Sequence, residues 1–482
     1  MQLQTILPVL GLLLMFFSSA SLPPAIVALL YNEPEISLFI FTFLSTLLIG
    51  WFLWFPFRHE QVEMGNRDGF IVTVLFWLVL GIVGAMPFLM MEAPALSWTD
   101  AFFESLSGLT TTGATILSHI ESLPRSILFY RQQLQWLGGM GIIVLAVAVL
   151  PMLGIGGMQL YRTEAPGPVK DRKLTPRIKE TAKALWYIYV GLTVICALGY
   201  WLAGMNVFDA ISHSFSTVAI GGFSTHDASM AYFDSPWIDG LTTFFMLIAG
   251  INFSLHFLVL RDRSLTHYWY DSEVRCYLFI LALVSVVVVS ALYWLEVYDL
   301  GDALHYGLFE VVSIATTTGY TSSGFSAWPL FLPFLLFLTS FAGGCAGSTA
   351  GGMKVIRILL IFKQGMREVY RLVHPNGVFV IKFGGHAISE KVGEAVWGFF
   401  SAYVFLFIIM FLLMMALGLD LTTAFSTVAS CMNNLGPALG AAADNYQALP
   451  DIAKWILCFA MLLGRLEIFT LLVLLTPMFW RY

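Results

Sequence analysis

Four segments decide the fold: FESLSGLTTTG (residues 103–113), SHSFSTVAIGG (212–222), FEVVSIATTTG (309–319) and STVASCMNNLG (426–436). When these four windows are aligned on their final glycines, the first and third share Phe-Glu at the start and Thr-Thr-Thr-Gly at the end. The second and fourth share Ser-Thr-Val-Ala, although not in the same register. A long apolar stretch precedes each window and another follows it, which indicates that one structural unit is repeated four times.

The composition is typical of a membrane protein. Of the 482 residues, 58% are hydrophobic and 11% are charged, whereas soluble chains are usually about 45–50% apolar and about 25% charged. Apolar runs of about 20 residues recur along the chain, and each is long enough to cross a hydrocarbon core. Because backbone groups in lipid must be satisfied internally, we expect helices near 4–30, 36–57, 69–91, 127–158, 184–204, 236–260, 276–296, 327–342, 351–364, 393–418 and 452–479.

The distribution of basic residues predicts the orientation. Most of the 24 Lys and Arg residues fall in 58–68, 161–183, 261–275, 354–391 and Arg481. Cytoplasmic loops retain positive charge, so we expect these segments and both termini on the cytoplasmic side. The scheme leaves out Arg125, Arg131, Lys454 and Arg465.

Each window reads as a short half-membrane helix followed by an irregular loop. Asp100 and Asp209 lie thirteen residues before their glycines and are expected to cap the first two short helices. Non-helical backbone at membrane depth is tolerated where protein buries it or where it lines a water-filled cavity. Glycine allows positive φ, and the carbonyl oxygens of such loops can replace the hydration shell of a cation. The alternative for any single window is close helix packing through small residues.

At this point a family resemblance is apparent. The four helix–pore-loop–helix units, the Thr-Thr-Thr-Gly segments 110–113 and 316–319, and FAGGCAGSTAGGMKVIR (341–357) resemble the Trk/Ktr/HKT superfamily. The chain length and two extra amino-terminal helices resemble the bacterial TrkH family. The resemblance implies an all-α integral membrane protein whose four pseudo-symmetric units surround one ion pore. The expected units are 61–160, 180–262, 274–366 and 392–482, with the extra helices in 1–60 and a cytoplasmic hairpin linker in 367–391.

The resemblance also implies a function and partners. It implies potassium uptake across a bacterial inner membrane by a homodimer embedded in the lipid bilayer. A cytosolic TrkA-type ring that binds nucleotide is expected to gate the pore. K+, and Rb+ with it, is expected as the transported ion, and we expect neither an organic cofactor nor a nucleic-acid partner.

Carried over to this chain, the filter segments are 110–114, 219–223, 316–320 and 433–437. The ion-binding residues expected from them are Thr111, Thr112, Gly113, Ile220, Gly221, Gly222, Thr317, Thr318, Gly319, Asn434, Leu435 and Gly436. Potassium channels carry Thr-Val-Gly-Tyr-Gly in every subunit, whereas each loop here has one aligned glycine and the fourth reads Asn-Asn-Leu-Gly-Pro. We therefore expect weaker discrimination against Na+.

Two features are candidates for a gate. Residues 342–352 contain five glycines, each costing about 1 kcal/mol in a helix relative to alanine, so we expect an intramembrane loop involving Gly343, Gly344, Gly347, Gly351 and Gly352. Arg465 is expected mid-helix, where an arginine must be paired or hydrated. In the family, the loop obstructs the cytoplasmic side of the pore and the arginine is a positive barrier beside it. The alternatives are a tightly packed helix and a structural ion pair.

Several smaller expectations remain open. Glu104 and Glu310 hold the same position in windows one and three and are expected either to bond their loops or, less readily, to contact ions. Alternation around Gly384-Gly385 predicts a small β-hairpin. A secondary transporter coupled to H+ or Na+ would predict inverted repeats, and an enzyme would need motifs such as H-E-x-x-H, which the sequence lacks.

Overall fold

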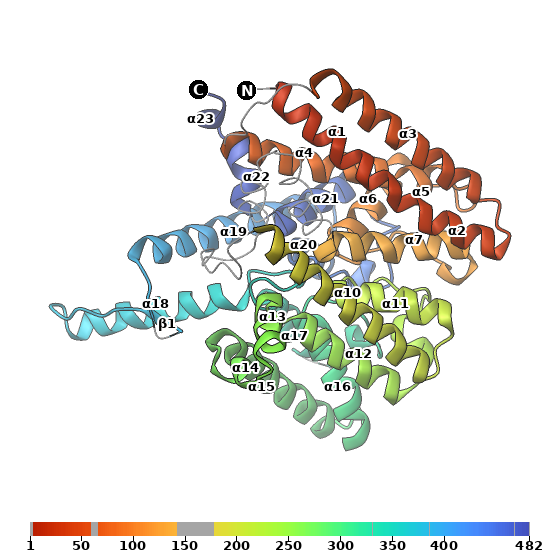
Figure 1. Cartoon of the computed structure of the whole chain (residues 1–482). Helices are drawn as coiled ribbons and strands as arrows, with labels where there is room; N and C mark the ends of the chain where they lie inside the picture. The colour runs from red at the N-terminus through yellow and green to blue at the C-terminus, as the bar shows by residue number, and fades with distance from the viewer. Residues whose placement is uncertain are drawn as a thin grey trace.

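The computed structural model describes residues 3–58, 66–141, 178–329, 331–384, 386–466 and 468–481. Helices make up most of these ranges (Figure 1), and the strands within them are β1 (Lys382–Phe383) and β2 (His386–Ala387). Six helices of the described part are long and apolar enough to cross a membrane, and two bent pairs raise the number of candidate spans to as many as eight. The chain is therefore a multi-pass membrane protein.

The amino-terminal helices form a hairpin. The chain passes through α1 (Leu3–Ser18), η1 (Ser19–Ser21) and α2 (Leu22–Tyr31), then returns through α3 (Ile36–Trp54) and η2 (Phe55–Phe57). The helices α1 and α3 cross closely because both carry glycine at the contact. A Cβ atom on Gly11 would overlap the carbonyl oxygen of Gly50, and the reverse is also true.

Four short helices carry the windows: α6 (Trp98–Leu109), α11 (Val207–Ala219), α16 (Leu300–Ala315) and α20 (Leu421–Asn433). At about 1.5 Å per residue they are too short to cross a hydrocarbon core of about 30 Å. The prediction that Asp100 and Asp209 cap the first two short helices is wrong by about one helical turn. The N-cap residues are Ser97 and Asn206, whose side chains accept hydrogen bonds from the backbone N–H groups of those aspartates.

Other helices, long and short, flank these four. They are α4 (Asn66–Gly84), α5 (Met86–Met90), α7 (Arg125–Trp136), α10 (Ile178–Leu202), α12 (Pro236–Ala249), α13 (Phe253–Asp262), α14 (Thr266–Tyr270), α15 (Ser272–Trp294), α17 (Leu332–Ser340), α18 (Val355–Val373), α19 (Glu390–Ala416), α21 (Asp451–Arg465), α22 (Ile468–Leu475) and α23 (Pro477–Trp480). A π-helical turn, η4 (Leu137–Gly141), extends α7. Short 3-10 turns are η3 (Ile120–Ser122), η6 (Ser229–Phe233), η7 (Phe325–Ala327) and η8 (Gly440–Ala442).

Two helices expected as single spans are broken. The span 236–260 bends by 94° between α12 and α13, and 452–479 bends by 117° between α21 and α22. The first break has a clear cause: Gly250 packs against the Tyr277 hydroxyl, and Asn252 caps α13 by accepting from the Ser254 amide. Apolar composition runs through both breaks, so hydropathy does not reveal them.

Three other helix boundaries differ from expectation. The helix expected over 351–364 runs from Val355 to Val373, and the one expected over 327–342 is limited to α17. The helix expected over 127–158 ends its α-helical part at Trp136. Residues 142–158 and the basic linker 161–177 lie outside the described residues.

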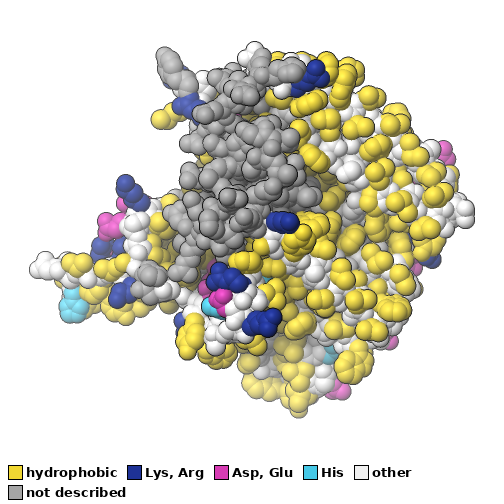
Figure 2. Space-filling model, in the orientation of Figure 1, with side chains coloured by type: hydrophobic (Ala, Val, Ile, Leu, Met, Phe, Trp, Pro, Cys, Tyr) yellow, Lys and Arg dark blue, Asp and Glu magenta, His cyan; other side chains and the backbone are white. Residues whose placement is uncertain are grey.

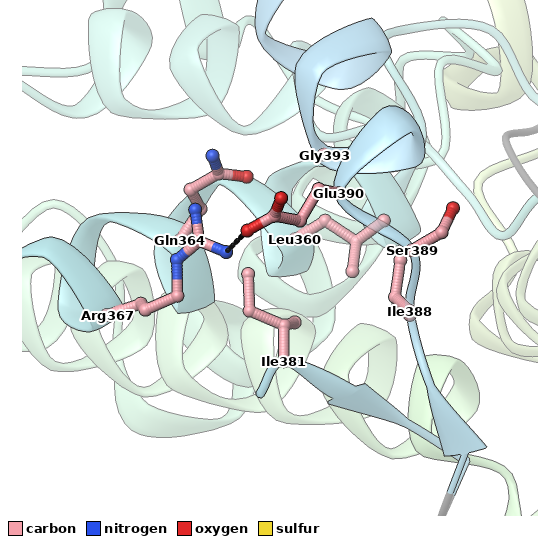
Figure 3. A pocket seen from close by; sticks show the side chains of 8 residues that line it. All are labelled: Leu360, Gln364, Arg367, Ile381, Ile388, Ser389, Glu390 and Gly393. Atoms are coloured by element: carbon pink, nitrogen blue, oxygen red, sulfur yellow. Dashed lines mark ion pairs between the residues drawn. The ribbon is translucent and has the colours of Figure 1, made fainter. Parts of the chain in front are cut away.

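The predicted hairpin is confirmed and lies on a projecting part of the molecule. Strands β1 and β2 pair antiparallel, with Phe383 opposite His386, beside the long helix α18 that projects from the body (Figure 1). A small pocket lies between α18, the hairpin and the start of α19, where Arg367 faces Glu390 (Figure 3). Hydrophobic side chains spread over the visible face of the body, whereas Lys and Arg gather on this projecting region and near it (Figure 2).

Candidate functional site

The four loops that end the windows share one backbone conformation. The residue two positions before each glycine has positive φ: 55° at Thr111, 54° at Ile220, 67° at Thr317 and 54° at Asn434. The aligned glycines follow with φ of 81°, 77°, 81° and 102°. Left-handed geometry is unusual for threonine and isoleucine, so its repetition at one register position indicates a shared structural requirement.

One hydrogen bond recurs in all four loops. The amide of the residue before each glycine donates to a serine carbonyl in the preceding short helix, at 2.8–2.9 Å, and the pairs are Thr112–Ser107, Gly221–Ser216, Thr318–Ser313 and Leu435–Ser430. This bond folds the chain back over the end of the short helix, as in a Schellman-type C-cap. Serine occupies the fifth position of every window. Sequence reasoning missed this signal, although all four windows contain it in register.

The four glycines form a closed ring. A Cβ atom on Gly113 would overlap the Gly221 carbonyl oxygen, and one on Gly222 would overlap that of Thr318. The pattern continues from Gly319 to Leu435 and returns from Gly436 to Thr112. Each glycine therefore lies against the carbonyl that precedes the glycine of the next loop. The residues that the sequence singled out in four distant windows meet around one axis.

The loops differ in how side chains support them. In the first loop the hydroxyls of Thr110 and Thr112 are 2.7 Å apart, and in the third those of Thr316 and Thr318 are 2.8 Å apart. The fourth loop has two asparagines instead. Asn433 accepts from the Tyr403 hydroxyl at 2.5 Å and donates to Ser340 at 2.9 Å. Asn434 donates to the Thr112 hydroxyl at 3.0 Å, which links the fourth loop to the first.

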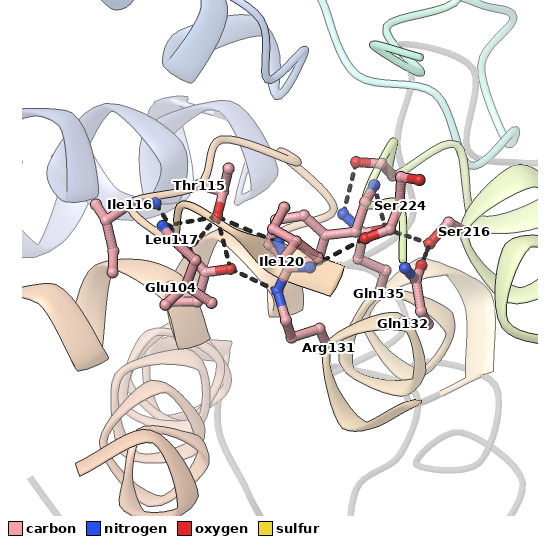
Figure 4. Close-up of polar contacts among 12 residues, drawn as sticks. Glu104, Thr115, Ile116, Leu117, Ile120, Arg131, Gln132, Gln135, Ser216 and Ser224 are labelled. Atoms are coloured by element: carbon pink, nitrogen blue, oxygen red, sulfur yellow. Dashed lines mark hydrogen bonds and ion pairs between the residues drawn. The ribbon is translucent and has the colours of Figure 1, made fainter. Parts of the chain in front are cut away.

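Glu104 and Glu310 bond the segments that follow their loops. Glu104 accepts from the Ile116 amide at 3.0 Å, and Glu310 accepts from the Ser322 amide at 2.8 Å. Glu104 is also paired with Arg131, whose Nε lies 2.8 Å from Oε1, and both side chains are fully buried (Figure 4). Arg131 was an exception to the charge scheme, and the structure gives it a partner on the first short helix.

A second charged cluster joins the segments after the first and second loops. His226 Nε2 lies 3.2 Å from an Asp209 oxygen and its Nδ1 lies 3.3 Å from Glu121. The Thr225 hydroxyl donates to the other Asp209 oxygen at 2.7 Å. The cluster therefore ties the short helix α11 to the segments that follow the first and second loops.

The glycine loop, residues 341–354 between α17 and α18, contacts three of the four window regions. The Gly351 amide donates to the Thr317 hydroxyl at 2.7 Å, and the Gly352 amide donates to the Asn433 carbonyl at 3.0 Å. The Thr349 hydroxyl donates to the Val218 carbonyl at 3.0 Å. Positive φ at Gly343, Gly347 and Gly352 keeps this segment out of helical geometry.

The same loop is tied to the break between α12 and α13. The Cys345 amide donates to the Gly250 carbonyl at 2.8 Å, and the Phe253 amide donates to the Gly347 carbonyl at 3.0 Å. Glu273 of α15 accepts from the Ala346 amide at 2.7 Å. The glycine loop is therefore anchored to α12, α13 and α15 through one part and contacts the window loops through another.

Arg465 is not mid-helix, as the sequence suggested, but is the last residue of α21, where the chain bends. Its guanidinium donates to the carbonyls of Gly138 and Gly139, the latter at 2.7 Å, and to the Thr111 hydroxyl at 3.3 Å. It also lies 5.7 Å from the centroid of the Trp77 ring. These contacts place the charge beside the first loop, while the glycine loop contacts the other three window regions.

Comparison with known proteins gives one consistent result. Residues 36–482 match the family model "TrkH: Cation transport protein". The chain is 57% identical to the Trk system potassium uptake protein TrkH of Halomonas elongata over 481 residues, and 57% identical to that of Salmonella typhimurium over 482, with full coverage of each chain. The crystal structure of the potassium transporter TrkH from Vibrio parahaemolyticus matches over the full length of both chains, with a TM-score of 0.91 and 55% identity.

Proposed function

The chain belongs to the TrkH family of cation transport proteins, and from this premise we propose that it conducts potassium through the ring of its four loops. It is a transport protein rather than an enzyme. The observation that carries the proposal is the closed ring in which each aligned glycine lies against a carbonyl of the next loop. The last three residues of each window supply the backbone oxygens that replace the hydration shell of the ion.

The four units are pseudo-symmetric about this ring in the proposed arrangement, and α1 to α3 stand outside them. The carboxyl ends of the four short helices carry partial negative charge toward the ring, which favours a cation over an anion. K+ and Rb+ are the proposed ions, and one aligned glycine per loop, against two glycines in each Thr-Val-Gly-Tyr-Gly segment of a potassium channel, supports weaker discrimination against Na+.

The gate we propose consists of the glycine loop and Arg465. The loop contacts Thr317 and Asn433, while the arginine contacts Thr111, so the two together lie beneath all four window regions. An intramembrane charge of this kind repels a cation in the pathway unless it moves. Because the loop is not helical and is anchored to Gly250, Phe253 and Glu273 by one hydrogen bond each, it can rearrange without breaking a regular helix.

The proposed setting is the bacterial inner membrane, with both termini cytoplasmic and the chain in a homodimer. A nucleotide-binding cytosolic ring is the proposed regulator, and the names of the relatives as Trk system proteins support a multi-component system. The projecting helix α18 and the hairpin, with their basic side chains, are a suitable surface for it (Figures 2 and 3).

Rubidium uptake into proteoliposomes tests this function. The purified protein should take up Rb+ down an imposed gradient, more strongly when the cytosolic ring and its nucleotide are supplied. Absence of uptake with the partner present would contradict the proposal. The alternative, an ion-coupled secondary transporter, predicts that collapse of the H+ or Na+ gradient stops uptake while the Rb+ gradient is maintained.

A further inference from the structure

The second loop is held by a side chain from another unit. Gln135 lies on α7 and its side chain is fully buried. Its Nε2 donates to the Gly221 carbonyl at 2.6 Å, and its Oε1 accepts from the Phe223 amide at 3.0 Å (Figure 4). The Ser216 hydroxyl donates to the same Oε1 at 2.7 Å. The Gln135 amide therefore forms hydrogen bonds with the residues on both sides of the aligned glycine, Gly222.

The Gly221 carbonyl, to which Gln135 donates, is part of the ring. The Gly221 oxygen is the one that lies against Gly113, and it corresponds to the carbonyls of Thr112, Thr318 and Leu435 in the other loops. A carbonyl oxygen has two lone pairs. A side-chain N–H bond at this oxygen occupies one of them and fixes the direction of the other. The second loop therefore offers the ion a more constrained oxygen than a free carbonyl would.

The second loop has no hydroxyl pair like those of the first and third loops. Its residues 219–221 are Ala-Ile-Gly, which carry no hydroxyl or amide side chain, whereas the first and third loops contain Thr pairs. A Cβ atom on Gly221 would overlap the amide of Gln135. Gly221 therefore leaves room for the Gln135 amide. This amide supports the second loop as the threonine pairs support the first and third loops.

We propose that Gln135 is a positioning residue that sets the ion discrimination of the filter by holding the Gly221 carbonyl at its place in the ring. This inference rests on the proposed cation pathway and adds a specificity determinant from outside the four loops. Discrimination between cations depends on the spacing and stiffness of the coordinating oxygens. A second loop without the Gln135 hydrogen bonds allows the ring to contract around the smaller Na+ ion. Loss of these bonds should therefore lower the preference for K+.

Gln135→Met is the primary test, because methionine has a similar volume and cannot form these hydrogen bonds. Gln133→Met is the matched control: Gln133 lies on the same helix, is buried, and donates to the Ala20 carbonyl at 2.9 Å, away from the loops. Relative uptake of Rb+ and Na+ is measured in proteoliposomes. The Rb+/Na+ ratio should fall by about twofold to tenfold in Gln135→Met, the range that one net hydrogen bond represents, and stay at the wild-type value in the control.

A steric rescue tests the same contact independently of the stability of that variant. Gly221→Ala should reduce Rb+ uptake strongly because the new methyl group meets the Gln135 amide. Adding Gln135→Ala should restore part of the uptake while leaving the ratio low. An unchanged ratio in folded Gln135→Met, or no rescue by the double variant, overturns the inference. Failure of the wild type to take up Rb+ would instead overturn the proposed pathway.

Discussion

The first and third loops support themselves, whereas the second and fourth are supported by residues around them. Thr110–Thr112 and Thr316–Thr318 are hydroxyl pairs within a loop. The second loop depends on Gln135, and the fourth uses asparagine amides that reach Tyr403, Ser340 and Thr112. Because φ at equivalent positions is nearly the same in all four, the backbone conformation does not depend on which side chains support it.

The two self-supported loops differ from each other in what contacts them from outside the ring. The hydroxyl of Thr111 accepts from Arg465, and that of Thr317 accepts from the Gly351 amide. These two threonines hold the same position in the self-supported loops. The gate candidates thus contact equivalent atoms in opposite units, one through a charge and the other through backbone. In the proposed function, the repeated framework provides the pathway and the unlike contacts added to it provide control.

The largest expected effect comes from the aligned glycines, because they are common to both classes. Gly319→Ala places a methyl group against the Leu435 carbonyl at φ of 81°, and left-handed geometry alone costs about 1–2 kcal/mol for an L-residue. Rb+ uptake should be lost nearly completely, and Gly222→Ala should behave alike. Gly240→Ala on α12, where a Cβ atom has no neighbour within 4 Å, should leave uptake unchanged. Retained uptake in Gly319→Ala would refute the ring.

The second prediction separates the first loop from the third. Arg131→Met leaves the buried carboxylate of Glu104 without its ion-pair partner, and breaking such a pair typically costs about 3–5 kcal/mol. The thermal stability of the detergent-solubilised protein should therefore drop sharply. Adding Glu104→Gln should recover much of the loss because it removes the stranded charge. Glu310, bonded by the amides of Ser322 and Ser323, should tolerate Gln far better than Arg131 tolerates Met.

The aligned glycines and the Arg131–Glu104 pair show which features the sequence can predict and which it cannot. Composition and the repeated glycines are enough to predict helices, four short helices with irregular loops, and an interruption at 342–352. Each of these backbone conformations requires particular residue types within a short stretch of sequence. Partners such as Arg131 and Glu104 lie 27 positions apart in the chain and become neighbours only through the packing of α7 on α6. The breaks at Gly250 and Arg465 also depend on contacts with other units.

The third prediction concerns the unlike additions beneath the ring. Arg465→Ala removes a positive charge near Thr111, so basal Rb+ uptake without the cytosolic partner should rise by about fivefold, as removal of about 1 kcal/mol of charge repulsion would give. Arg465→Lys keeps the charge and should keep basal uptake low. Identical uptake by wild type and Arg465→Ala, with and without the partner, would exclude this residue from the gate.

The smallest expected effect distinguishes two hydroxyls that hold the same position. Thr318→Val breaks only the bond to Thr316, whereas Thr112→Val breaks the bond to Thr110 and the one donated by Asn434 of the fourth loop. With about 1 kcal/mol for each net hydrogen bond, Thr112→Val should lower the thermal midpoint more than Thr318→Val does. If the two shifts are equal, the Asn434 contact does not contribute, and the first loop is as independent of the fourth as the third loop is of its neighbours.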